Sequence, residues 1–72
     1  MKNSQKFPEI LKSLRTANGL SIREAAKEFE ISPSLLQRYE SGEVSPGYKK
    51  IIKIAEVLRV PVDTLVGRGL VA

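Results

Sequence analysis

Arg38 and Gln37 are the neighbouring side chains of this 72-residue sequence that are best suited to recognition chemistry. A guanidinium can bond O6 and N7 of guanine bidentately, and a glutamine amide can bond N6 and N7 of adenine. Ser34, one helical turn earlier, could bond either kind of base, while Pro33 and Leu35 offer only carbon, which suits the thymine methyl. The alternative is that these side chains form a solvated helix face, with partial burial of Leu35.

Other kinds of chemistry are disfavoured by what the sequence lacks. It contains no histidine and no cysteine, the usual general base and the usual metal ligands. Glu24, Glu28 and Glu30 are close in sequence but have no catalytic partner, and they are typical of a solvated helix face. No Walker loop, dinucleotide-binding glycine pattern or calcium loop is present. We therefore predict no enzymatic activity, no metal site and no cofactor.

Composition and charge fit a small globular domain. The chain is 42% hydrophobic and 28% charged, and 72 residues allow at most one domain, 1–72, with a modest core. A net charge of +4 is compatible with a nucleic-acid partner, although many small domains carry as much. No apolar run could span a membrane and no signal peptide is evident. We expect a cytoplasmic protein of a prokaryote or phage, associated with the nucleoid.

Local signals predict two short helices joined by a tight turn. Ser21 and Glu24 form a capping box that begins a helix ending near Phe29. Ser32 and Pro33 are the N-cap and first residue of the next helix, 33–41, which Gly42 closes. The three-residue link between the helices forces a sharp angle, which is typical of a helix-turn-helix unit.

Three further helices are predicted around this unit. Apolar spacing predicts a helix over 7–17, ended by Gly19, with its inward face listed as Phe7, Ile10, Leu11, Leu14 and Ala17. Ser45-Pro46 is expected to begin a long helix, whose inward residues are Tyr48, Ile51, Ile54, Ala55 and Leu58. Pro61 precedes a short helix over 62–66, and the tail 67–72 is expected to be frayed. The sequence thus predicts an all-α, five-helix bundle with its core over 7–66.

The stretches LSIREAAKEFEISPSLLQRYESG and SPGYKKIIKIAEVLRVPVDTL resemble the lambda-repressor and Cro-like (Xre-type) helix-turn-helix domain. The resemblance covers residues 7–66, and its most specific positions are Leu20, Ser21, Ala26, Tyr39, Glu40, Ser41, Gly42, Pro46, Ala55, Leu58, Val60 and Leu65. It implies a lambda-repressor-like DNA-binding bundle whose helix 33–41 enters the major groove. The implied base-reading residues are Pro33, Ser34, Leu35, Gln37 and Arg38.

The same resemblance implies a set of phosphate contacts. In the family, the N-termini of the second and third helices and the loop after Gly42 approach the DNA backbone. The corresponding positions are Ser21, Ile22, Arg23, Ser32, Ser41, Ser45, Lys49 and Lys50. At Ile22 the family usually has a glutamine, so this chain lacks a hydrogen bond there or uses methyl groups on thymine. The alternative is that these serines cap helices or lie in solvent, and that Arg23 is simply a solvated side chain.

Arg15 and Glu40 match family positions that pair across the first and third helices, and we expect a structural ion pair. Four further residues depart from the family pattern. Glu30 and Arg59 stand where glycine is usual, Ala25 replaces a usual leucine, and Glu43 begins a loop where lysine is common.

The resemblance implies a sequence-specific transcriptional regulator, a repressor or controller, that binds palindromic double-stranded DNA as a homodimer. Apolar residues beyond the inner stripes would support self-association or simply fill the core; they are Ile52, Val57, Val62, Val66, Leu70 and Val71. One alternative is an antitoxin or other protein-interaction module of the same fold, with a toxin as partner. Another is the N-terminal DNA-binding domain of a longer regulator, with 67–69 as linker.

Overall fold

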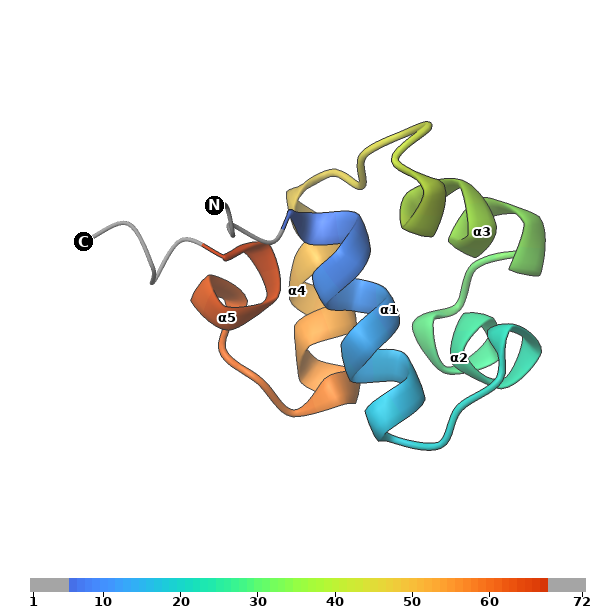
Figure 1. Ribbon diagram of the computed structural model, residues 1–72, viewed down its shortest axis with the longest axis horizontal. Helices are drawn as coiled ribbons and strands as arrows, with labels where there is room; N and C mark the ends of the chain where they lie inside the picture. The colour runs from blue at the N-terminus through green and yellow to red at the C-terminus, as the bar shows by residue number, and fades with distance from the viewer. Residues whose placement is uncertain (1–5, 68–72) are drawn as a thin grey trace.

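The computed structural model describes residues 6–67, which contain five α-helices and no strand. The helices are α1 (Phe7–Ala17), α2 (Ile22–Phe29), α3 (Pro33–Ser41), α4 (Tyr48–Leu58) and α5 (Val62–Val66) (Figure 1). The all-α prediction is therefore confirmed. None of these helices is long and apolar enough to cross a bilayer within the described part of the chain.

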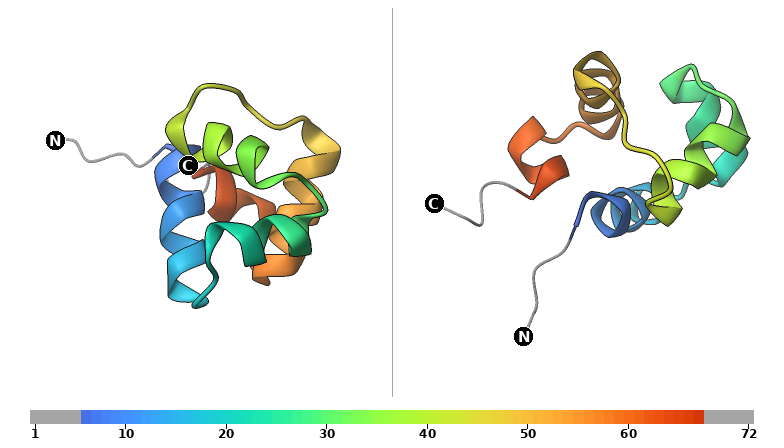
Figure 2. Two further views of the ribbon diagram at one scale, coloured as in Figure 1. Left: turned by 90° about the vertical axis from the view of Figure 1, so that its right-hand side faces the viewer. Right: turned by 90° about the horizontal axis from the view of Figure 1, so that it is seen from above.

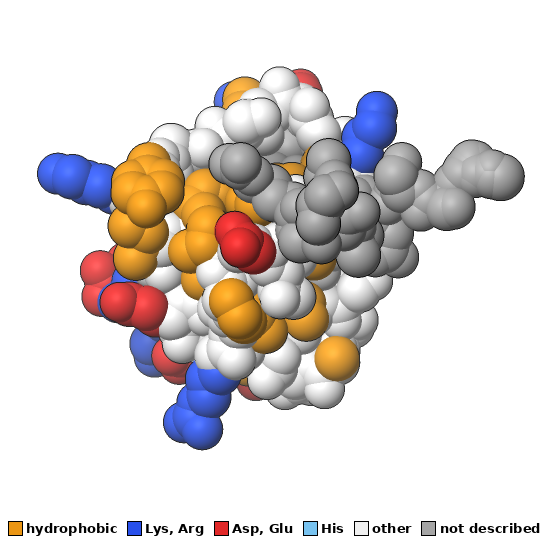
Figure 3. Space-filling model, turned by 90° about the vertical axis from the view of Figure 1, so that its left-hand side faces the viewer, with side chains coloured by type: hydrophobic (Ala, Val, Ile, Leu, Met, Phe, Trp, Pro, Cys, Tyr) orange, Lys and Arg blue, Asp and Glu red, His pale blue; other side chains and the backbone are white. Residues whose placement is uncertain are grey.

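Each helix contributes one large, fully buried side chain to a single core. These are Leu11, Phe29, Leu36, Ile54 and Leu65. Helix α1 packs against α3 and α5, α2 packs against α3 and α4, and α4 packs against α5. As a result, α2 and α3 together form one side of the molecule, which faces the viewer in the left panel of Figure 2. On the opposite side, where α5 lies, hydrophobic side chains reach the surface (Figure 3).

The buried face of α1 differs from the expectation in its last turn. Ala17 was expected inward but is exposed, whereas Arg15 is buried. Leu11 and Arg15 are four residues apart and so share a helix face, and Ala17 lies about 200° around the helix from Arg15. Ala17 lies on the same side of the helix as buried Ile10, but it is the last residue of α1, and the core does not extend over it.

The start of α4 also corrects the sequence prediction. Ser45 and Pro46 do not begin the helix; Gly47, with extended backbone (φ −75°, ψ 176°), is its N-cap. Residues 42–47 are instead used to cross from α3 to α4 (Figure 1). Tyr48, expected inward, is 74% exposed because it occupies the first position of α4, beyond the core; Ile51, one turn later, is buried. At the other end, Gly67 is the left-handed C-cap of α5, and the predicted tail residues 68–72, with Leu70 and Val71, lie outside the described residues.

Candidate nucleic-acid interface

The turn between α2 and α3 is closed by Glu30 in the left-handed region. Its φ is 62°, and the N–H of Ile31 donates to the carbonyl of Ala26 at 2.9 Å, which ends α2 abruptly. A non-glycine residue in this conformation costs about 1–2 kcal/mol. A glycine, which the resemblance leads one to expect at this position, would adopt this conformation without that cost. Lys53 of α4 lies 3.4 Å from the Glu30 carboxylate, an exposed ion pair of small energetic value.

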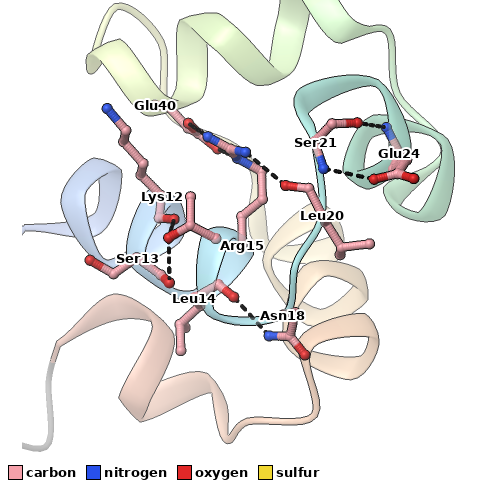
Figure 4. A network of polar contacts seen from close by, with 10 residues as sticks. Lys12, Ser13, Leu14, Arg15, Asn18, Leu20, Ser21, Glu24 and Glu40 are labelled. Atoms are coloured by element: carbon pink, nitrogen blue, oxygen red, sulfur yellow. Dashed lines mark hydrogen bonds and ion pairs between the residues drawn. The ribbon is translucent and has the colours of Figure 1, made fainter.

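Both predicted serine caps are present. Ser21 Oγ accepts from the N–H of Glu24 at 3.1 Å, and Ser32 Oγ accepts from the N–H of Leu35 at 3.0 Å. The N–H of Ser21 in turn donates to Glu24 Oε1 at 2.9 Å, which completes the capping box (Figure 4). Both serines are exposed, and a hydroxyl that accepts in a cap still has its own O–H to donate. Capping and phosphate binding are thus compatible at Ser32, whereas the Ser21 hydroxyl also hydrogen-bonds the Glu24 carboxylate.

The capping box also holds a negative charge at the start of α2. The Ser21 N–H and then the Ser21 hydroxyl lower the pKa of Glu24 from its ordinary value of 4.5, because both favour the ionised carboxylate. The positive end of the helix dipole favours the same charge state.

The exposed face of α3 is defined by residues at helical spacing. Ser34, Gln37, Arg38 and Ser41 are all exposed and follow the i, i+3, i+4, i+7 pattern of one face. Leu36 and Tyr39 are buried on the opposite side and hold the helix against α1 and α2. Pro33 is exposed at the first position, but Leu35 is half-buried against the core, in line with the burial alternative for it.

Ser41 and Ile22 are less suited to phosphate binding than the sequence suggested. Ser41 Oγ donates to the carbonyl of Arg38 at 3.1 Å, so its proton is already used. Ile22 is half-buried and packs against the core. Arg23, Ser45, Lys49 and Lys50 are exposed, Arg23 at the start of α2 and the other three in the loop before α4 and its first turn.

The predicted ion pair between α1 and α3 is present. Arg15 Nε donates to Glu40 Oε2 at 2.7 Å and Nη2 donates to Oε1 at 3.1 Å, while Nη1 donates to the carbonyl of Leu20 at 2.8 Å (Figure 4). The two side chains are 10% and 8% exposed. This network joins α1, the segment before α2 and the base of α3. The bond to Leu20 was not foreseen, since a backbone carbonyl leaves no signal in the sequence.

A second ion pair, between Arg38 of α3 and Glu43 just after the helix, was not predicted from the sequence. Glu43 Oε1 lies 3.9 Å from Arg38 Nε, and both side chains are exposed. The sequence did contain a signal for this pair, namely Gly42, because a left-handed glycine after a helix folds the following residue back over the last turn.

The comparisons with known proteins agree with this geometry. The helix-turn-helix family matches residues 11–65. A phage transcriptional repressor, RstR of Vibrio cholerae, is 36% identical over 88% of this chain and 56% of its own length, so the chain spans little more than half of that relative. The restriction-modification controller protein C.AhdI from Aeromonas hydrophila is 30% identical, with a TM-score of 0.78 over 82% of this chain and 89% of its own.

The P22 c2 repressor, solved in complex with a synthetic operator, shares the fold with a TM-score of 0.81 at 18% identity, over 86% of this chain and 94% of its own. The family match covers most of the chain, including every residue of the turn between α2 and α3. This chain therefore belongs to the helix-turn-helix family, with the lambda-repressor-like fold that its sequence resembles.

Proposed function

We propose that this chain is a transcriptional repressor or controller that reads operator DNA with the exposed face of α3. The observation that carries the proposal is the single face formed by Ser34, Gln37, Arg38 and Ser41, backed by buried Leu36 and Tyr39. A rigidly held helix with an amide and a guanidinium on its outer face suits the major groove, where these groups distinguish adenine and guanine. The repressor and controller relatives support the same function.

Within this proposal, the contacts divide into two classes. Gln37 and Arg38 read base edges, Ser34 adds a hydroxyl near the start of the helix, and Pro33 offers carbon to a thymine methyl. The remaining polar candidates serve the DNA backbone and fix the orientation of the domain: Ser21, Arg23, Ser32, Ser45, Lys49 and Lys50. The ionised Glu24 carboxylate already occupies the N-terminus of α2, so the exposed guanidinium of Arg23 is the group that favours a phosphate there.

A second copy of the chain completes the proposed site. One α3 covers only about 4–6 base pairs, so useful specificity needs two half-sites about one helical turn apart. Hydrophobic side chains reach the surface on the side where α5 lies, away from α2 and α3 (Figure 3). The half-buried Val62 and Val66 of α5 are the candidates for self-association there, and Ile52 and Val57 of α4 are half-buried as well. A dimer formed there leaves α3 of each copy open to DNA.

The test is selection of binders from a random duplex library at low salt, followed by sequencing and a salt titration of the selected site. We expect a palindrome with regular half-site spacing. We also expect the fraction of bound DNA to rise sigmoidally with protein concentration, because two copies bind together. Enrichment of no sequence, with only salt-sensitive general affinity, contradicts the proposal. That result would favour the antitoxin alternative, in which a protein partner covers one of these faces.

A further inference from the structure

The end of α3 brings Glu43 back over Arg38. Gly42 adopts the left-handed conformation (φ 82°), and the N–H of Glu43 donates to the carbonyl of Arg38 at 3.0 Å. Val44 N–H points at the same carbonyl at 3.5 Å, and Ser41 Oγ donates to it at 3.1 Å. This backbone arrangement places residue 43 beside residue 38 whatever its side chain is. The proximity of the two charges is therefore built into the helix terminus.

The side-chain geometry determines which edge of the guanidinium is engaged. Glu43 Oε1 lies 3.9 Å from Nε of Arg38, and the side chains are 56% and 67% exposed. At this distance the pair is a charge attraction and not a hydrogen bond. The guanidinium carries five N–H donors in a planar fork, so a carboxylate beside Nε leaves the terminal Nη1 and Nη2 groups for another partner. Guanine, with O6 and N7 acceptors side by side, takes such a pair of donors.

We propose that Glu43 is a positioning residue, which braces Arg38 through Nε so that Nη1 and Nη2 are directed at a guanine; this assignment rests on the proposed function. Arg38 is a long, exposed side chain that could equally bind a nearby phosphate, which carries no sequence information. The carboxylate competes with phosphate for the guanidinium. It also repels the DNA backbone, so it lowers affinity for every sequence while it favours the base-directed orientation.

The experiment compares Glu43→Gln with Glu56→Gln, which removes the same charge from an exposed position on α4. Binding is measured on the selected site, on the same site with its Arg38-dependent guanine replaced, and on random DNA. We expect Glu43→Gln to lower the preference for guanine by about two- to fivefold, the range of an exposed ion pair, and to tighten binding to random DNA. Glu56→Gln should leave the base preference unchanged.

A double-mutant cycle shows whether Glu43 acts through Arg38. In an Arg38→Ala background, Glu43→Gln should no longer alter the preference at that base. If Glu43→Gln tightens all three DNAs by the same factor, the residue is only a repulsive charge and the assignment is wrong. A wild-type chain that selects no sequence contradicts the proposed function and this assignment together. If the wild-type chain selects a sequence but Glu43→Gln leaves the preference for guanine unchanged, the assignment of Glu43 is wrong and the proposed function stands.

Discussion

Arg15 of α1 and Glu40 of α3 form a bidentate ion pair, and the remaining Arg15 Nη donates to the backbone at Leu20. The pair is nearly buried, and in the described part of the chain no buried side-chain nitrogen or oxygen lacks a hydrogen-bond partner. Glu40 lies near the C-terminal end of the proposed recognition helix, so the geometry of the ion pair fixes the orientation of α3 relative to α1. The pair also keeps the Glu40 carboxylate neutralised on a helix that is proposed to approach phosphates.

Removing one member of this pair should destabilise the fold strongly. We expect Arg15→Ala to lower the free energy of unfolding by roughly 3–5 kcal/mol, because Glu40 would remain buried without its partner. Urea denaturation followed by circular dichroism measures the loss. The double variant Arg15→Met/Glu40→Leu should recover most of the stability, since it buries no charge. A loss below about 1 kcal/mol for Arg15→Ala would show that the pair behaves as an exposed one.

Replacing Arg38 should separate base reading from backbone binding. We expect Arg38→Ala to weaken binding to the selected site by about 1–3 kcal/mol and to relax the preference at one base pair, since a bidentate contact would be lost. Titrations on the selected site and on random DNA measure both effects. Equal losses on the two DNAs would make Arg38 a phosphate contact.

Lys49 should contribute to the affinity for DNA whatever the DNA sequence is. It is exposed in the first turn of α4, and its replacement by alanine should weaken binding to all DNAs and reduce the salt slope by about one unit. Lys27→Ala, which removes an exposed lysine near the end of α2, is the matched control for net charge. Neighbouring Lys50 points about 100° away around the helix, so only one of the two is expected to alter the slope. If the slope is unchanged in Lys49→Ala, this residue is not at the interface.

Relief of backbone strain should stabilise the domain. Glu30 has a φ of 62°, and glycine in its place would remove about 1–2 kcal/mol of left-handed strain. The greater freedom of glycine in the unfolded chain offsets about 0.4–1 kcal/mol, so the net gain for Glu30→Gly is expected to lie between about 0 and 1.6 kcal/mol. Arg59→Gly, at a φ of 60° after α4, should behave alike and serves as the comparison in thermal denaturation. Destabilisation of Glu30→Gly alone would show that the ion pair with Lys53 outweighs the strain.

Stability at acid pH should depend on the capping box of α2. Because folding depresses the pKa of Glu24, the ionised carboxylate stabilises the fold above its ordinary pKa of 4.5, and this contribution is lost as the pH falls through the folded value. We expect Glu24→Gln to flatten the pH dependence of unfolding below about pH 4.5. Urea denaturation between neutral pH and pH 3 measures how the free energy of unfolding depends on pH. Glu28→Gln removes an exposed carboxylate from the same helix without disturbing the cap, and the two variants should differ.

The local signals of this sequence determined most of the helices. Ser21, Ser32 and Gly42 begin or end helices by contacts within four residues, and such contacts are encoded by neighbouring residues alone. The all-α fold was predicted for this reason and is confirmed, and the helix-turn-helix family, predicted from the resemblance, is confirmed as well. The pairing of Arg15 with Glu40 came from the resemblance, since residues 25 positions apart leave no local trace of their contact.

The tertiary structure decided which predicted faces are covered. Tyr48 continues the apolar stripe of α4 but lies outside the core, and Ala17 does the same on α1, because no neighbouring helix extends over them. Helical periodicity specifies a stripe along a helix; it does not specify how far the partner reaches, which depends on where the other elements pack. The pair of Arg38 and Glu43 is different, because Gly42 at the end of α3 brings these two residues together by local backbone geometry and no packing between helices is needed.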